Sequence, residues 1–228
     1  MPKHEVVSHE EWLRAREAFL VEEKAHMRRG DELAAKRREL PWEKVDKPYV
    51  FDSDAGKVAL VELFGHQTQM IVYHFMFPPE DDEGCKHCSF WADHYDGVQV
   101  HLAHRDVAFT AISRAPLAKI EKFKRRMGWK FRWVSSSGTD FNYDFQASFE
   151  DPEHAYYNFR MTHPGMHDRE GISVFAREGK QVFHTYSTYA RGIEVVNSTY
   201  AFLDLVPKGR DEGKEPQAWV RHHDRYED

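Results

Sequence analysis

Cysteine is scarce in this chain, which has only two such residues among 228. Two cysteines are too few for the disulfide framework of a small secreted protein. A chain of this length can bury roughly 70% of the surface that it exposes when unfolded, so it needs neither a disulfide nor a metal in order to fold. The scarcity therefore favours a reducing cytoplasm, where a Cys-x-x-Cys pair is more often catalytic or metal-binding than structural.

Long apolar runs and positive net charge are also lacking. No stretch approaches the ~20 apolar residues that span a membrane, and charges throughout the first twenty positions argue against a signal peptide. The formal net charge is −6, which argues against a nucleic-acid partner. We therefore expect no membrane and no nucleic acid among the partners. Histidine, by contrast, is plentiful at 15 residues, so a metal site has to be considered.

The two cysteines form one motif, Gly84-Cys85-Lys86-His87-Cys88. It follows a dense apolar run at 70–77, which reads as a buried strand, and a break at Pro78-Pro79. Redox dithiols are usually found in this order of elements: a strand, a turn and then a Cys-x-x-Cys motif at the start of a helix.

The residues beside Cys85 suit thiol–disulfide exchange, in which the thiolate is the nucleophile. The pKa of the Cys85 thiol should be lowered by its position at a helix start and by the charges of Lys86 and His87. Four carboxylates at 80–83 should raise it. Screening over about 8–10 Å weakens the carboxylates, so we expect a modestly lowered pKa for Cys85. Cys88, one helical turn on and deeper, would be the resolving thiol. The alternatives are a structural staple or two inert thiols in a non-catalytic binding module.

Zinc binding is the rival hypothesis. Cys85 and Cys88 are followed by His101 and His104, close to zinc-finger spacing. The histidine pair is one residue tighter than usual, the apolar finger positions are missing, and the motif lies between two buried strands. These points favour redox chemistry, and no metal or other cofactor is expected.

Three other residues are weaker candidates for a supporting role. His74 lies within the predicted strand, where it is either a satisfied core histidine or a proton shuttle. Trp91 is close to the dithiol and either shields it or packs in the core. Arg114 follows a strand at 107–113 at its carboxyl end, where parallel sheets place functional groups, although a surface ion pair explains it equally well.

The middle of the chain alternates strands and helices. Strands at 70–77, 107–113 and 131–135 alternate with a helix after Cys85 and an amphipathic helix at 116–127, which favours a parallel sheet with right-handed crossovers. A hairpin at 171–187 and a helix at 193–205 follow. The region 136–170 is rich in aromatic residues without a clear period, and is either a packed insertion or a lid.

The ends of the chain read as appendages. Ser8 and Glu11 form a capping box for a helix that Gly30 ends or breaks, and Asp31 caps a second piece that stops at Pro41. We interpret this run as a solvated helix whose apolar stripe packs on the body, with a homodimer arm as the alternative. The expected organisation is an extension at 1–45, a domain at 46–207 and a C-terminal tail at 208–228. Within this tail we expect a charged, mobile loop at 208–216, and we expect Trp219 to pin the C-terminus to the body.

Several strings resemble the domain-of-unknown-function 899 family, described as thioredoxin-like predicted dithiol–disulfide oxidoreductases. They are Cys-Ser-Phe-Trp-Ala-Asp at 88–93, Ser-Arg-Ala-Pro at 113–116, Asp-Phe-Asn-Tyr-Asp-Phe at 140–145 and His-Thr-Tyr-Ser-Thr-Tyr-Ala-Arg-Gly at 184–192. The resemblance implies a thioredoxin/peroxiredoxin-like mixed sheet flanked by helices, with Cys85 attacking and Cys88 resolving. It also implies a disulfide or peroxide substrate and a thiol reductant. The chain departs from it in the Lys86-His87 spacer and in lacking a proline near Glu170-Gly171.

Overall fold

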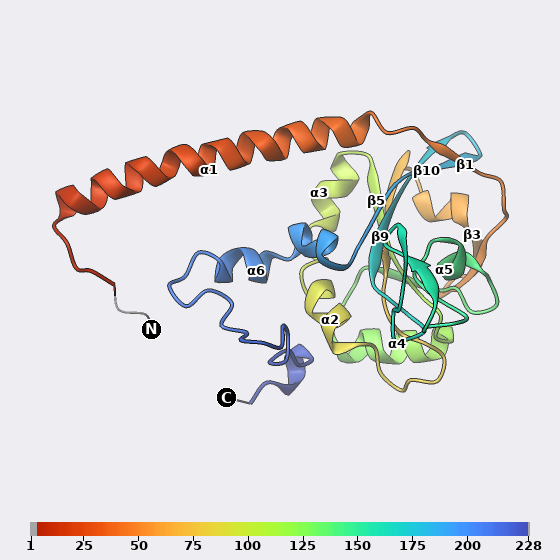
Figure 1. The fold of residues 1–228 in the computed structure, drawn as a ribbon. Helices are drawn as coiled ribbons and strands as arrows, with labels where there is room; N and C mark the ends of the chain where they lie inside the picture. The colour runs from red at the N-terminus through yellow and green to blue at the C-terminus, as the bar shows by residue number, and fades with distance from the viewer. Residues whose placement is uncertain (1–3, 228) are drawn as a thin grey trace.

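The computed structural model describes residues 4–227, whose course Figure 1 shows. The helices are α1 (His9–Arg38), α2 (Lys86–Ala92), α3 (Gln99–His104), α4 (Leu117–Arg126), α5 (Phe141–Asp144) and α6 (Ser198–Leu203), with 3-10 turns η1 (Leu60–Phe64), η2 (Ala190–Val196) and η3 (His223–Arg225). The strands are β1 (Glu43–Val45), β2 (Val50–Ser53), β3 (Gly56–Ala59), β4 (Gln69–His74), β5 (Val107–Ser113), β6 (Arg132–Ser135), β7 (Ala155–Tyr157), β8 (Arg160–Thr162), β9 (Gly171–Glu178) and β10 (Gln181–Tyr189).

Eight strands form one mixed sheet in the order β1-β10-β9-β4-β5-β6-β2-β3. Strands β4, β5 and β6 are parallel, as the alternation of strands and helices predicted, while β9 runs antiparallel to β4 and forms a hairpin with β10. Strand β4 therefore lies inside the sheet with a partner on each side. The α/β class and the mixed central sheet flanked by helices are confirmed.

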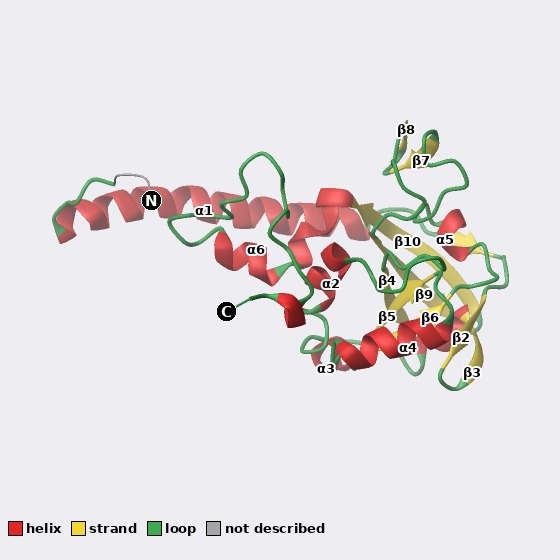
Figure 2. Cartoon of the chain, turned by 90° about the horizontal axis from the view of Figure 1, so that it is seen from below, coloured by secondary structure: helices red, strands yellow, loops and turns green. Residues whose placement is uncertain are grey.

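Both faces of β4 are covered, which explains why the strand is apolar on both sides. On one face Tyr73 packs with residues of α2 and α4, and on the other Met70 and Val72 pack with η1 and the α5 region. Figure 2 shows α4 lying along the sheet. Burial on two faces holds the carboxyl end of β4 rigidly, and this end leads into the cysteine motif.

Helix α1 differs most from the prediction. The capping box at Ser8 and Glu11 is confirmed, but the helix runs without a break through Gly30 to Arg38. The expected packing on the body is also wrong, because none of its residues is buried, and Figure 1 shows the helix projecting from the sheet as an arm. Within residues 4–227, no helix combines the length and apolar character needed to cross a membrane.

The structure also differs from the sequence-based prediction in segments whose hydrophobic period did not distinguish a helix from a strand. The apolar run at 58–64 divides into the end of β3 and the turn η1, and the helix expected at 193–205 is η2 followed by α6, interrupted at Asn197. Residues Glu43–Val45, expected in the N-terminal extension, pair with β10 as an edge strand. The aromatic region at 136–170 is mainly packed through α5, while β7 and β8 form a small separate hairpin.

The continuous helix makes a prediction for Gly30. A Cβ added there meets no atom within 4 Å, and alanine loses less backbone entropy in a helix than glycine does. Gly30→Ala should therefore stabilise the middle of α1 by roughly 0.5–1 kcal/mol. Amide hydrogen exchange of residues 26–34 measures the change, with Gly30→Pro as the opposite control. Faster exchange in Gly30→Ala would contradict a continuous helix.

Candidate functional site

Cys85 and Cys88 are both fixed to one residue at the end of β4. The Cys85 amide donates to the carbonyl oxygen of Met76 at 3.1 Å, and the Met76 amide donates to the Cys88 sulfur at 3.4 Å. Cys85 is the N-cap residue of α2, and Cys88 lies in its first turn. The two thiols are thus positioned where the central strand passes into the helix, and both are in the reduced form.

The two sulfurs differ in depth. Cys88 is only 1% exposed and belongs to the core formed with Tyr73 and Tyr95. Cys85 is half-buried and lines a cavity of about 360 Å³ with Met76, Pro78, Glu80, Asp81, Met166, His167 and Asp168. A molecule entering this cavity meets the Cys85 sulfur first and leaves Cys88 behind it.

Their proton affinities differ in the same sense. The hydrogen bond from the Cys88 thiol lowers the pKa of Cys85 well below its usual range, and a hydrogen bond and the positive charge of His87 add to this against the effect of burial. Burial raises the pKa of Cys88 well above its usual range, and the interaction with Cys85 raises it further. Within the pair, Cys85 therefore loses its proton more readily than Cys88 does.

The acidic run at 80–83 does not act as one block. Glu83 is bound by Arg126 at 2.6 Å and by Arg225 at 2.8 Å, and these bonds lower the pKa of its carboxyl group. Asp81 is different, because burial raises its pKa first and the charges of Glu80, Asp168 and Cys85 raise it further. Asp81 is thus the member of the run that lies in the electric field of the dithiol.

The C-terminal segment holds the loop that precedes Cys85. His222 donates through Nε2 to the Gly84 carbonyl at 2.9 Å, and Asp224 binds Arg126, the partner of Glu83. Val220 is fully buried and Trp219 packs edge-on against Phe90. The prediction that Trp219 pins the C-terminus to the body is therefore confirmed.

Gly84 also fixes that loop by close packing. A Cβ at this position would lie 2.7 Å from the rings of Phe75 and Phe123. Only glycine allows the chain to approach these rings so closely, and Cys85 follows directly.

His74 lies apart from the cysteines. Its ring stacks on Phe141 at a centroid distance of 5.7 Å, on the sheet face opposite Tyr73, and its Nε2 hydrogen bonds Ser173 at 2.8 Å. Burial lowers the pKa of His74 to about 3, so the ring is neutral. Contacts of 2.8 and 2.7 Å continue from Ser173 through Ser187 to His184. This geometry supports a core histidine rather than a proton shuttle, although within residues 4–227 its Nδ1 is buried without a hydrogen-bond partner.

Trp91 and Arg114 support the site from further away. Trp91 donates through Nε1 to the Ile193 carbonyl at 3.1 Å and packs in the core around α2. Arg114 pairs through Nε with Asp168 at 2.8 Å and donates to the Tyr143 hydroxyl at 3.1 Å. Because Asp168 lines the cavity at Cys85, Arg114 acts on that cavity through its partner.

Two carboxyl groups near the dithiol escaped the sequence analysis. Glu170 immediately precedes β9, and its pKa is raised by burial and by the charge of Cys85. Asp168 is 5% exposed, and its Oδ1 accepts from Arg114 and, at 2.7 Å, from Ser148. Both lie over 80 residues from Cys85 in the chain, and only the pairing of β9 with β4 brings this segment beside it.

The zinc hypothesis finds no ligand set. His101 and His104 belong to α3, a separate short helix after the turn that follows α2. Between residues 4 and 227, no three histidine, cysteine or carboxylate side chains gather in a way that could hold a metal ion. The four predicted ligands are therefore not brought together.

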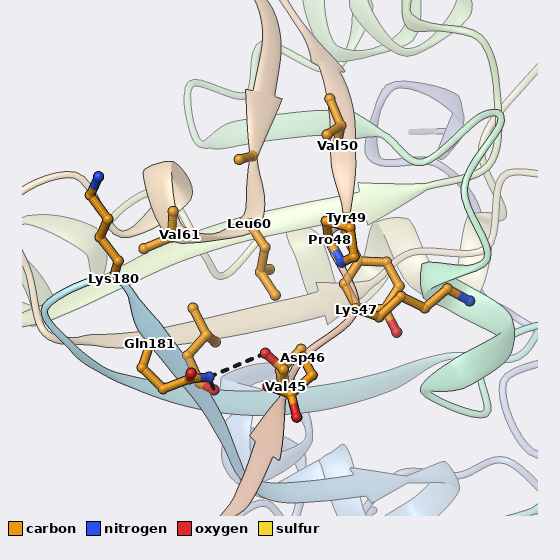
Figure 3. A pocket seen from close by; sticks show the side chains of 12 residues that line it. Val45, Asp46, Lys47, Pro48, Tyr49, Val50, Leu60, Val61, Lys180 and Gln181 are labelled. Atoms are coloured by element: carbon orange, nitrogen blue, oxygen red, sulfur yellow. Dashed lines mark hydrogen bonds between the residues drawn. The ribbon is translucent and has the colours of Figure 1, made fainter.

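A second hollow lies at the other end of the sheet (Figure 3). It has a volume of about 300 Å³ and is lined by the link from β1 to β2, by the start of η1 and by the tip of the β9–β10 hairpin. Its floor is apolar around Leu60, and Gln181 crosses it to donate to the Val45 carbonyl at 3.2 Å. Neither cysteine of the chain is among its lining residues.

The order of the strands and the dithiol at the carboxyl end of β4 define a thioredoxin-like α/β protein. The chain matches, over residues 1–226, the family described as "Bacterial protein of unknown function (DUF899)", and it belongs to that family. No curated protein matches the sequence.

Several solved structures of peroxiredoxins are similar to this chain. A PrxQ from Xylella fastidiosa is 12% identical with a TM-score of 0.43, covering 69% of this chain and 89% of that chain. The peroxidoxin BcpB from Mycobacterium tuberculosis is 12% identical with a TM-score of 0.44, covering 70% and 95%. The mitochondrial 2-Cys peroxiredoxin from Plasmodium falciparum is 12% identical with a TM-score of 0.45, covering 72% and 94%.

The asymmetry of the two thiols predicts their reactivity. Because the pKa of Cys85 is lowered, its alkylation by iodoacetamide should reach a plateau at a lower pH than that of an ordinary thiol, while Cys88 stays unmodified until the protein unfolds. His87→Gln removes one lowering interaction and should move the midpoint to higher pH. Peptide mass spectrometry reads both cysteines, and His66→Gln on the exposed turn after η1 is the control. Equal alkylation of both cysteines in the folded protein would contradict the asymmetry.

Proposed function

We propose that this protein is a thiol–disulfide oxidoreductase that cycles Cys85 and Cys88 between the dithiol and the disulfide. The observation that carries the proposal is the position of the two sulfurs, one open to a cavity and the other hydrogen-bonded behind it. Attack and resolution need these two environments. Cys85 must be able to contact the substrate, and Cys88 must stay protonated until the mixed disulfide has formed.

The proposed reaction begins with the Cys85 thiolate. It attacks one sulfur of a substrate disulfide, forms a mixed disulfide and releases the other half as a thiolate. Cys88 then loses its proton and attacks the Cys85 sulfur, which forms the Cys85–Cys88 disulfide and releases the second half of the substrate. Glu170 is the half-buried carboxyl group available to accept that proton. A thiol reductant restores both thiols and is itself oxidised to a disulfide.

A peroxide is the other substrate that fits this site. The Cys85 thiolate would attack one peroxide oxygen and become a sulfenic acid, and the alcohol or water would leave. Condensation with Cys88 would release water and give the same internal disulfide. We therefore propose that the substrate is a protein disulfide or a peroxide. Either would meet the Cys85 thiolate in the same cavity, and Cys88 would resolve either intermediate.

The setting of this chemistry is also proposed. Residues 46–207 would be the redox domain, with 1–45 as an extension and 208–228 as a tail that buttresses the dithiol loop. The reducing cytoplasm suits a pair of thiols that must be regenerated. The functional unit would be a homodimer, because α1 leaves large apolar side chains uncovered.

The two cysteines should fail in different ways when replaced. Cys85→Ser should abolish dithiothreitol-coupled reduction of disulfides and peroxides, because it removes the attacking thiolate. Cys88→Ser should still complete the first step and accumulate a mixed disulfide on Cys85, seen as a mass increase. Thermal unfolding of both variants controls for folding. Full turnover by Cys85→Ser would rule out the proposed function.

A further inference from the structure

The cavity at Cys85 has an unusual polar lining. Its charged side chains are the carboxylates of Glu80, Asp81 and Asp168, and neither lysine nor arginine lines it. The rest of the wall is apolar, from Met76, Pro78 and Met166, with His167 beside them. His167 Nδ1 donates to the Phe149 carbonyl oxygen at 2.9 Å.

Asp168 leaves an unused acceptor at this cavity. Its Oδ1 binds Arg114 and Ser148, but its Oδ2 is buried and, among residues 4–227, has no hydrogen-bond partner. A buried carboxylate oxygen without a partner carries an unfavourable desolvation cost. A ligand that donates a hydrogen bond there would relieve this cost.

The cations near the cavity do not cancel its charge. Arg114 is engaged by Asp168, and Lys119 binds the backbone carbonyls of Pro79 and Asp81 at 3.0 and 2.7 Å. Lys86 and His87 follow Cys85 in the first turn of α2, outside the lining. Within residues 4–227, Glu80 and Asp81 therefore form no ion pair beside the cavity of the reactive sulfur, although the charge of Lys119 acts on Asp81 from outside the lining.

We propose that this cavity selects disulfides whose flanking groups are cationic or hydrogen-bond donors, such as a disulfide in a basic protein segment, and rejects anionic ones. This rests on the proposed function of Cys85. Ammonium groups would pair with Asp81 and Glu80 and could donate to Asp168 Oδ2, whereas a carboxylate would meet like charges.

Three small disulfides of different charge test the proposal. They are cystamine, which is cationic, 2-hydroxyethyl disulfide, which is neutral, and dithiodiglycolate, which is anionic. The measured quantity is the rate at which each oxidises the pre-reduced full chain, read by mass spectrometry after acid quenching. Each rate is divided by that of dithiothreitol with the same disulfide, which removes the differences in leaving-group chemistry.

Cystamine should be preferred over dithiodiglycolate by about tenfold or more at low salt. The double variant Glu80→Gln with Asp81→Asn should bring this ratio close to one, while Glu178→Gln, at the opposite end of the sheet, should not change it. Equal normalised rates in the native protein, or a ratio unchanged by the double variant, would overturn the selectivity and leave the redox function standing. If none of the three disulfides oxidises Cys85 and Cys88, the proposed redox function is wrong, and so is the proposed selectivity.

A separate observation concerns α1. Its large apolar side chains form two neighbouring columns with a seven-residue spacing, Trp12, Phe19 and Leu33 in one and Leu13, Leu20 and Met27 in the other. All six are exposed. A seven-residue apolar repeat is the pattern of helices that pair along their length, and an isolated helix gains little stability without such packing.

The charges of α1 are divided between its halves. Residues 9–23 carry five carboxylates and two arginines, whereas residues 24–38 carry six basic residues and two carboxylates. A parallel pair would place like charges together, and an antiparallel pair would match opposite ones. Alignment on the midpoint of α1 places Glu10 opposite Arg37 and Arg16 opposite Asp31.

We infer that α1 pairs antiparallel with α1 of a second copy of this chain. The interface would be two-fold symmetric and self-complementary. The two bodies would lie at opposite ends of a helix pair about 45 Å long, so each dithiol would stay open and act independently.

The mass in solution tests the pairing. The full chain should sediment at twice 26.9 kDa at micromolar concentration, and Leu20→Glu should return it to the monomer. Leu205→Glu, at a residue 80% exposed outside α1, is the matched control and should stay dimeric. A monomeric native chain, or a Leu20→Glu variant that remains dimeric, would overturn the inference.

Cross-linking tests the orientation. In a Cys85→Ser, Cys88→Ser background, Glu23→Cys lies near the two-fold axis and should cross-link to itself on oxidation. Leu13→Cys should not cross-link to itself but should do so with Ala34→Cys on the partner. Self-cross-linking at both positions would show a parallel pair and contradict the antiparallel arrangement.

Discussion

The site depends on two hydrogen bonds at Met76. One joins its carbonyl to the amide of Cys85, and the other joins its amide to the sulfur of Cys88. Met76 lies two residues beyond β4, which is paired on both sides and covered on both faces. The positions of both sulfurs are therefore fixed by the strand that is paired and covered on both sides. Helix α2, which carries Cys88, is only about two turns long.

Burial then divides the chemistry between the two cysteines. The same desolvation that keeps the proton on Cys88 makes its thiol a donor, and that donor stabilises the thiolate of Cys85. The loop before Cys85 is held from outside by His222 and by the Arg126 bridge between Glu83 and Asp224. Residues at the far end of the chain thus fix the attacking sulfur without touching it.

The arm and the body follow different physical rules. In the body, strands and helices are held by shared cores, whereas α1 buries none of its residues. A helix of this length is held by its capping box, its intrahelical ion pairs and whatever covers its apolar columns. The proposed antiparallel pairing would cover these columns with the same helix of a second copy.

The sequence by itself determined the features that depend on local order. Apolar runs, turn residues and spacing predict the strand at 70–77, the helix after Cys85 and the hairpin at 171–187. The spacing of the two cysteines likewise identifies the Cys85–Cys88 pair. Only the tertiary structure decided which distant groups face that pair, because Asp168, Glu170 and His222 arrive through strand pairing and tail docking that no local pattern encodes. The continuity of α1 through Gly30 is by contrast a local matter, since a single glycine costs a helix only about 1 kcal/mol.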